Sequence, residues 1–376
     1  NFTLLHPCQT TAFPRIVSHT QDCKKQIFMN QYKVTIAMPV YNVAPYVERS
    51  LLSALSQSFQ NIEFLIIDDK GTDNSMEIVR QIVSTHPRGK DVRIIDHRIN
   101  QGPGQTRNTA IEQAQGEYLY FMDSDDEIMP DCIQALYDAM TETPVDFIAA
   151  SHIVVRDNQP IRESVLPNRI LNGTYELWQY QSSAKQPIYI VTWNKLYRLK
   201  FLKNNHIRCA PHHRNEDEIF TTQVWCEACS CRLLSNITYK YRLISTSTMR
   251  QIKQQGFTDT IAHQYQEIFA FKKQYFAQFA HTAFFSFCTN DFLRTLLLMK
   301  LAVSNSSSLT QKEKYFFIRK YSDFTQYPVS KAKLTGRARL VYTIGKLPAN
   351  IQLWICHSIL NLISIKHYCL KFAKAS

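Results

Sequence analysis

The chain has 376 residues, of which 45% are hydrophobic and 20% are charged, as in an ordinary folded protein with a sizeable core. Its ten cysteines follow no regular spacing, which argues against a disulfide framework and favours a reducing compartment. The net charge of +12 would attract nucleic acid or an anionic membrane, but no recognised nucleic-acid-binding motif accompanies it, so nucleic acid is not an expected partner.

The first 31 residues are predicted to be an appendage to the fold, with disorder as one expectation. They begin without Met, contain Pro7 and Pro14, and show neither a signal-peptide pattern nor a clear amphipathic period. Met29 stands just before the first expected strand and is a candidate for the natural start. The sequence leaves open whether residues 1–28 belong to the natural protein.

From Lys33 onward, short apolar runs alternate with segments of helical periodicity. Strands are expected at 34–38, 62–67, 92–95, 117–122 and 146–150, with helices around Leu51 and at 76–84, 106–115 and 130–140. This alternation predicts an α/β fold with a mostly parallel sheet covered by helices on both faces. From residue 254 onward the sequence is helical and rich in aromatic residues, which predicts a helical C-terminal region.

Acidic residues follow two of the expected strands. Asp68 and Asp69 end the second strand, and the DSDD segment at 123–126 ends the fourth. Because ligands of such sheets bind beyond the carboxyl ends of the strands, the two clusters are expected to face one crevice. Carboxylates this close together repel unless a cation lies among them, and a hard divalent cation such as Mg²⁺ or Mn²⁺ suits oxygen ligands. An ordinary helix N-cap at Asp125 or Asp126 is the simpler alternative.

At this point the residues resemble a known family. The segments PVYN at 39–42, IIDD at 66–69, GQTRN at 104–108 and DSDD at 123–126 look like the nucleotide-binding half of family 2 glycosyltransferases, which have the GT-A (Rossmann-like) fold. WNKLYR at 193–198 and NEDEIF at 215–220 look like the acceptor-side landmarks of that family. The resemblance covers roughly residues 34–250, and the order and separation of its motifs make it specific.

The resemblance implies a role for each motif residue on the donor side. Pro39 and Tyr41 would frame the base of the nucleotide, and Asp69 would accept a hydrogen bond from it. Arg107 would lie near the nucleotide and help to fix it. The DSDD residues would contact the donor together: Asp123 the ribose, Asp125 the metal that bridges the diphosphate, and Asp126 the metal or the sugar.

On the acceptor side, the resemblance implies that Asp217 is the catalytic base, with Glu216 as its nearest rival, and that Trp193 walls the acceptor pocket. A single base with in-line attack would invert the anomeric carbon. The chain departs from the family after the acidic pair, where Lys70-Gly71 replaces the common Gly-Ser; Lys70 is expected to point to water. His212, His213, Arg242 and Arg250 are weaker candidates in the same region.

The last part of the chain has an unusual charge distribution. No Asp or Glu occurs from 324 to 376, whereas eight Lys and Arg residues lie within 329–376. The uncharged stretch at 347–365 is interrupted by Pro348 and by polar residues, so it makes a poor membrane-spanning helix. We expect segment 329–376 to be a basic amphipathic tail that lies on an anionic membrane surface.

These expectations divide the chain into an appendage (1–31), a GT-A catalytic domain (32–250, with a nucleotide-binding half at 32–126 and an acceptor half at 127–250), a helical aromatic-rich region (251–328) and the tail. The expected enzyme is a metal-dependent inverting hexosyltransferase of surface polysaccharide synthesis, with a UDP-linked donor and a saccharide or lipid-linked acceptor. It would be cytoplasmic and peripheral on the inner face of the cell membrane. A nucleotidyltransferase is an alternative, but no glycine-rich phosphate loop follows the first strand. The second alternative is a non-catalytic membrane-associated adaptor.

Overall fold

The structure, a computed structural model, describes residues 32–211, 216–244, 259–322, 324 and 327–372. The predicted N-terminal appendage lies outside these residues, as do His212, His213 and Arg250.

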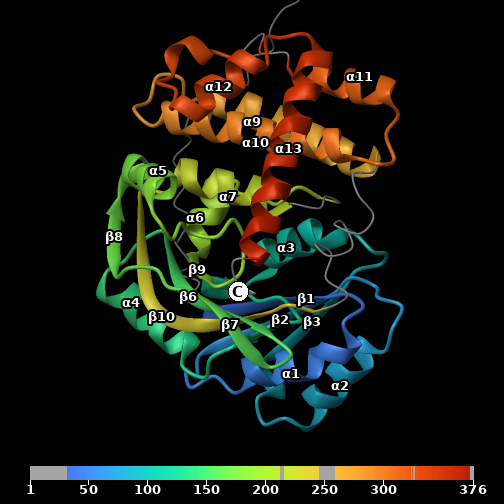
Figure 1. Cartoon of the computed structure of the whole chain (residues 1–376). Coiled ribbons are helices and arrows are strands. Elements are labelled where there is room, and N and C mark those ends of the chain that lie inside the picture. The colour runs from blue at the N-terminus through green and yellow to red at the C-terminus, as the bar shows by residue number, and fades with distance from the viewer. Residues whose placement is uncertain (1–31, 212–215, 245–258, 323, 325–326, 373–376) are drawn as a thin grey trace, which may run out of the picture.

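The described strands form one ten-stranded mixed sheet (Figure 1). They are β1 (Tyr32–Val40), β2 (Ile62–Asp68), β3 (Val92–Asp96), β4 (Gly116–Phe121), β5 (Glu127–Ile128), β6 (Phe147–Arg156), β7 (Gln159–Ser164), β8 (Arg169–Asn172), β9 (Lys195–Arg198) and β10 (Ser230–Arg242). The main order is β3-β2-β1-β4-β9-β6-β10-β5, with β7 beside β6 and β8 beside β10. Strands β3, β2, β1 and β4 are parallel, as are β6 and β10, and β9 is antiparallel between them.

The central strands are buried on both faces, which explains their nearly continuous apolar sequence. Every residue of β2 is buried, and alternate side chains enter different cores: Phe64 and Ile66 lie in one hydrophobic cluster, Leu65 and Ile67 in the other. Both faces must therefore carry helices, as the sequence predicts.

The helices of the first two thirds of the chain cover both faces of the sheet. They are α1 (Ala44–Leu55), α2 (Ser75–Thr85), α3 (Gly102–Gln113), α4 (Cys132–Glu142), α5 (Gly173–Ser183), α6 (Leu199–Asn204) and α7 (Glu216–Glu227), with a short 3₁₀ turn η1 (Gly89–Asp91). Buried side chains of α1, α2 and α4 belong to one core, and those of α3, α5, α6 and α7 to the other. The predicted fold class is confirmed.

The remaining helices form a layer on top of α5 and α7 (Figure 1). They are α9 (Asp259–Ala277), α10 (Phe285–Asn305), α11 (Gln311–Tyr321), α12 (Gly336–Ile344) and α13 (Ala349–Phe372), with a 3₁₀ turn η2 (Val329–Lys331). Their buried side chains continue the core of the α7 face, so this layer is packed on the sheet domain without a break. Helix α13 packs on α10 and α11. Within the described part of the chain, we find no helix with the length and apolarity needed to span a membrane.

Among the predicted elements, the start of α3 and the end of β6 differ from the predicted boundaries by four residues or more. Helix α3 begins at Gly102 rather than at residue 106, because Gly102 adopts φ 82° and Pro103 follows in the first turn. Strand β6 extends to Arg156, well past the predicted residue 150, because it pairs with β7 in a hairpin. The register of this hairpin depends on the partner strand, which the local pattern does not reveal.

Candidate active site

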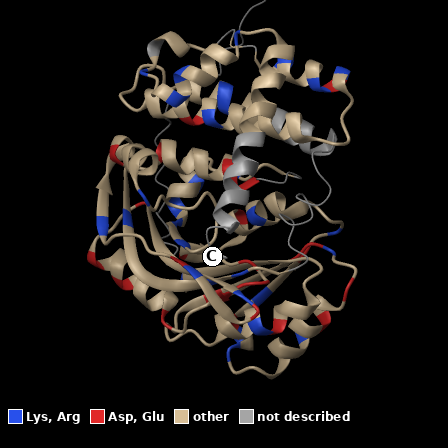
Figure 2. Cartoon of the chain, in the orientation of Figure 1, with Lys and Arg blue, Asp and Glu red and all other residues tan. Residues whose placement is uncertain are grey.

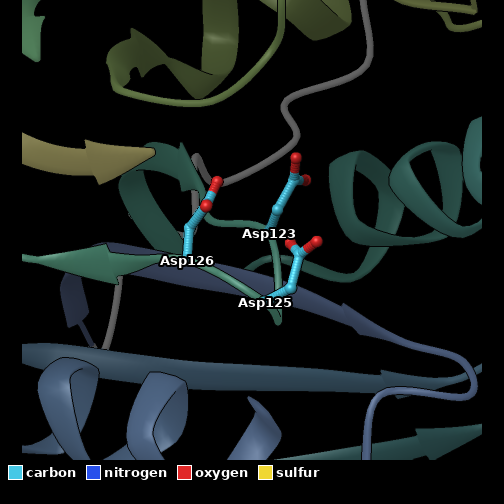
Figure 3. A group of neighbouring side chains, drawn as sticks. All are labelled: Asp123, Asp125 and Asp126. Atoms are coloured by element: carbon cyan, nitrogen blue, oxygen red, sulfur yellow. The ribbon is translucent and has the colours of Figure 1, made fainter. Parts of the chain in front are cut away.

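The DSDD segment lies directly after β4 and Met122, at the carboxyl end of the parallel strands. Carboxylate oxygens of Asp123, Asp125 and Asp126 lie within 4.8 Å of one another, and Figure 3 shows the three groups pointing to the same side of the turn. Burial, and then the charge of Asp123, raises the pKa of Asp125 to about 6. Burial followed by the charges of Asp125 and Asp123 also raises the pKa of Asp126. A cation among these oxygens would remove the repulsion, and the all-oxygen donor set fits a hard divalent ion.

Asp126 is the most firmly held of the three. Its side chain is fully buried, and its Oδ2 accepts a hydrogen bond from the Tyr239 hydroxyl (2.8 Å) while its Oδ1 accepts one from the Arg242 backbone N–H (2.7 Å). Ser50 Oγ donates to its carbonyl oxygen (2.6 Å). Strand β10 and helix α1 thus fix the acidic turn from both sides, which orients the two other carboxylates toward the open side.

Arg107, on α3, connects the acidic turn with the start of α7. Its Nη2 is 2.9 Å from Asp123 Oδ1, its Nη1 bonds Glu216, and the same Nη1 is 3.9 Å from Asp217 Oδ1. Burial alone would lower the pKa of this guanidinium, but Asp217, Asp123 and Glu216 together raise it above its usual value. One buried cation therefore brings three of the sequence-predicted site carboxylates together, from motifs about a hundred residues apart.

Glu216 and Asp217, the two candidates for the catalytic base, have different surroundings. The Glu216 side chain is 9% exposed and bound to Arg107, and burial raises its pKa to about 7, although Arg107 opposes the shift. The Asp217 side chain is 21% exposed, and its Oδ1 accepts the Thr192 backbone N–H at 3.2 Å. Asp217 is thus the more accessible carboxylate, and this exposure supports its predicted role as the catalytic base. That role stays a prediction.

Asp69 occupies a different environment from the DSDD residues. It is 3% exposed, and its two carboxylate oxygens bond the His97 ring, the Asn100 side chain and the backbone N–H groups of Gln101 and Gly102, at 2.8–3.1 Å. A carboxylate has about four acceptor sites, so these donors fill them. The predicted hydrogen bond to a nucleobase would require one donor to leave. In this conformation Asp69 fixes the loop that leads into α3 and hence the position of Arg107.

Among the described residues, only one of the two acidic strand ends therefore contributes to the carboxylate cluster. The other strand end borders a hollow of about 350 Å³ beside Tyr41. Pro39 lies near the end of β1, and Tyr41, which lines the hollow, is 47% exposed. Lys70 also lines the hollow, and its backbone has φ 57°. Lys70 Nζ is 3.3 Å from Asp68 Oδ2, so it is ion-paired rather than pointing only to water. The predicted base-framing roles of Pro39 and Tyr41 stay predictions.

Trp193 is 4% exposed and contributes to the lining of a small cavity of about 10 Å³, and its predicted place in the wall of an acceptor pocket stays a prediction. It stacks on Tyr239, with ring centroids 4.5 Å apart and an interplanar angle of 8°, and on Tyr241 at 5.5 Å. The ring centroids of Tyr189 and Trp193 are 6.2 Å apart. Trp193 thus belongs to an aromatic cluster that reaches Asp126 through the Tyr239 hydroxyl. Tyr239 was not among the predicted site residues, because its only signal in the sequence is an aromatic residue within a strand.

A second hollow, of about 270 Å³, is lined by Arg49, Arg156 and Arg242 and by one carboxylate, Asp157. Glu127 binds two of these arginines, with Arg49 Nε 2.9 Å from Glu127 Oε1. Since the cations outnumber the anions here, the hollow suits an anionic group. Arg242, which was a weaker candidate from its position in the sequence, therefore lies at the site.

The fold and this arrangement define a class: a GT-A-type enzyme, with an acidic turn after a central parallel strand. A solved structure with the same fold is that of S. aureus TarS 1–349 in complex with UDP-GlcNAc, with a TM-score of 0.51 and 20% identity over 83% of this chain and 79% of that one. Residues 35–205 match the family described as Glycosyl transferase family 2. Over this segment, which is a little less than half of the chain, the chain is similar to glycosyltransferase family 2.

Two curated relatives agree with this assignment. An uncharacterized glycosyltransferase of Haemophilus influenzae is 40% identical over 127 residues, which is 34% of this chain and 46% of that protein. Poly(ribitol-phosphate) beta-N-acetylglucosaminyltransferase TarS of Staphylococcus aureus is 29% identical over 215 residues, 56% of this chain and 35% of that protein. The chain thus spans half or less of the length of these relatives. The family favours a glycosyltransferase over the nucleotidyltransferase and the adaptor considered from the sequence.

Proposed function

We propose that the chain transfers a sugar from a UDP-linked donor to a hydroxyl group of a saccharide or lipid-linked acceptor, with inversion and in a metal-dependent manner, during surface polysaccharide synthesis. The observation that carries this proposal is the network around Arg107, which holds Asp123 of the acidic turn and the Glu216–Asp217 pair together. A donor-binding group and a candidate base are thereby within one site.

Asp125 and Asp123, with Asp126 behind them, would hold Mg²⁺ or Mn²⁺. When bound, such an ion supplies Lewis-acid stabilisation of a diphosphate leaving group. Asp217 takes the proton of the acceptor hydroxyl as that oxygen attacks the anomeric carbon on the face opposite the diphosphate. Attack from that face, with no second nucleophile, inverts the configuration. Arg107 keeps Glu216 ion-paired, so the more exposed Asp217 meets the acceptor.

The acceptor proposal rests on surfaces next to this network. The partly exposed rings of Tyr189 and Tyr241 offer apolar faces beside the acidic turn, and such faces suit a saccharide ring. The arginine-lined hollow suits a phosphate on the acceptor or its carrier. The names of the poly(ribitol-phosphate) transferases among the relatives support a phosphate-bearing polymer or lipid. A membrane-presented acceptor would place the enzyme on the inner face of the cell membrane.

The test is donor binding and turnover with UDP-GlcNAc as the probe, with and without Mn²⁺. Asp125→Ala should abolish metal-dependent binding of the donor in calorimetry. Asp217→Asn should bind the donor as the wild type does but lose transfer by roughly 10²–10⁴-fold, the usual contribution of a general base. Asp138→Asn, an exposed carboxylate on α4, is the matched control and should change neither.

If Asp217→Asn retained wild-type turnover while Glu216→Gln lost it, the base would be Glu216. If neither UDP-sugars nor other nucleotide sugars bound in the presence of metal, the proposed donor class would be wrong.

A further inference from the structure

Helix α12, the start of α13 and the turn between them expose large apolar side chains. Trp354 is 70% exposed, Leu340 59%, Ile351 41% and Leu347 37%. Ile351 and Trp354 are three residues apart on α13, so they lie along one side of that helix, and Leu347 lies in the turn just before it. We call these four residues the apolar ridge.

The ridge has a fixed orientation because the opposite side of α13 is packed. Leu353 and Cys356 are buried, and α13 contacts both α10 and α11. The Gln352 side chain is also buried, where its Oε1 accepts a hydrogen bond from Lys300 Nζ at 2.6 Å and its Nε2 donates to the Leu347 carbonyl at 2.7 Å. Segment 329–376 is thus not a loose tail over its described first part: one side belongs to the core, and the other presents Trp354 to solvent.

Basic residues accompany the ridge. Arg337, Arg339 and Lys346 are exposed, and none of them forms an ion pair with any residue that the structure describes. Lys346 lies over the ring of Tyr342, with its Nζ 4.2 Å from the ring centroid. No Asp or Glu occurs in the sequence from 324 to the last residue, and Figure 2 shows Lys and Arg prevailing over Asp and Glu across the helical layer.

We infer that the apolar ridge and its three cations dock on the surface of an anionic lipid bilayer. A tryptophan beside aliphatic side chains suits the boundary between headgroups and acyl chains, where its ring is apolar and its N–H remains hydrated. Arg337, Arg339 and Lys346, which form no ion pair with the described residues, would be attracted by the negative surface potential of anionic lipids. The ridge would lie in the membrane plane, consistent with the lack of a spanning helix among the described residues.

A protein partner would have to present acidic groups opposite these cations, since charges across protein interfaces are complementary, whereas an anionic bilayer supplies negative charge over its whole surface. This inference deepens the membrane-presented part of the proposed function. Its test needs no sugar nucleotide, so failure of docking and failure of sugar transfer are separate results.

Trp354 makes the test direct. Of the four tryptophans of the chain, Trp178, Trp193 and Trp225 are no more than 4% exposed, so a fluorescence change on membrane binding reports on Trp354. The full chain is mixed with phosphatidylglycerol-containing vesicles or with pure phosphatidylcholine vesicles, and both emission and co-sedimentation are measured. We expect a blue shift and co-sedimentation with the anionic vesicles, both weakened by salt.

Ile351→Ser combined with Trp354→Ser should weaken co-sedimentation by about tenfold or more, from the lost apolar burial. Arg337→Gln with Arg339→Gln should reduce binding to anionic vesicles only. Ile161→Ser, at a site 48% exposed on β7 of the sheet domain, is the matched control and should bind as the wild type does. Thermal unfolding of each variant verifies the fold.

Equal sedimentation of the Ile351/Trp354 double variant and the wild type would overturn the inference. The inference would also be overturned if the wild type bound no vesicles. If the wild type then formed dimers that the double variant did not form, the ridge would be an interface between copies of this chain.

Discussion

Lys272 lies in the core between α7, α9 and α10, and its replacement by methionine is predicted to destabilise the protein strongly. The side chain is 1% exposed, and its Nζ donates to Glu218 Oε1 (2.6 Å), Asp291 Oδ2 (2.7 Å) and Thr295 Oγ1 (3.0 Å). Glu218 directly follows the candidate base on α7. The ammonium group therefore ties the helical layer to the helix that carries Asp217.

The expected magnitude follows from what Lys272→Met leaves behind. Removing one partner of a buried ion pair costs about 3–5 kcal/mol, because the other charge stays buried without compensation. Asp291 retains Arg294, whose Nη2 is 2.8 Å from Asp291 Oδ1, whereas Glu218 has no other ion-pair partner among the residues that the structure describes. We therefore expect about 3 kcal/mol, which for a chain of 376 residues corresponds to a fall in melting temperature of roughly 4 °C.

The pH dependence gives a second signature. Burial would raise the pKa of Asp291, but Lys272 and Arg294 overcome it and lower the pKa below its usual value. The stabilisation from this shift is present above the unfolded-state pKa of about 3.9 and is lost as pH falls through the lower folded-state value. Lys272→Met removes part of that stabilisation, so its deficit relative to the wild type should be constant from neutral pH down to about 4 and should shrink as pH falls further, through the folded-state pKa.

Urea unfolding of both proteins at neutral and acidic pH measures the deficit. Lys312→Met, at an exposed position on α11, is the control and should change stability by less than about 0.5 kcal/mol. Adding Glu218→Gln to Lys272→Met should recover part of the loss, since the uncompensated charge is removed. A Lys272→Met protein as stable as Lys312→Met would refute the reasoning.

Two further substitutions test the packing and the polar contacts of the site. In Gly104→Ala, the new Cβ would lie 1.9 Å from the Ala210 carbonyl oxygen, so α3 must move. We expect a stability loss above about 2 kcal/mol, measured by urea unfolding, and a loss of turnover. The control is Gly336→Ala, whose new Cβ would have nothing within 4 Å and should change urea unfolding little. Tyr239→Phe removes the hydroxyl that donates to Asp126. It should weaken Mn²⁺ binding roughly 10–100-fold in calorimetry, and unchanged affinity would show that this hydrogen bond does not orient the acidic turn.

Much of the sheet could be predicted because its signals are local. The apolar runs of β1 and β2 mark strands that are buried on both faces, and the DSDD segment after β4 marks the carboxyl edge, where ligands of such sheets bind. The resemblance to glycosyltransferase family 2 followed from short motifs of fixed order. The start of α3 was misplaced because a positive φ at Gly102 lets the helix begin earlier than the periodicity of its apolar residues suggests.

The contacts between distant segments were beyond the sequence. Nothing near Asp69 shows that the loop at 97–102 fills its acceptor sites, and nothing near Trp193 shows that it stacks on Tyr239. In the sequence, Lys272 is one of several polar residues in an aromatic-rich helical segment, and only the packing of three helices makes it a buried cation.

The sequence by itself determined the α/β class, the family and the position of the acidic turn, because periodicity, turn residues and motif spacing are properties of short segments. The tertiary structure decided that Arg107 binds Glu216 and leaves Asp217 the more exposed of the pair, and that α13 turns Trp354 outward. The physical reason is that burial and charge pairing depend on which distant residues surround a side chain. A local pattern carries no information about those neighbours, so the partners of each charge had to come from the fold.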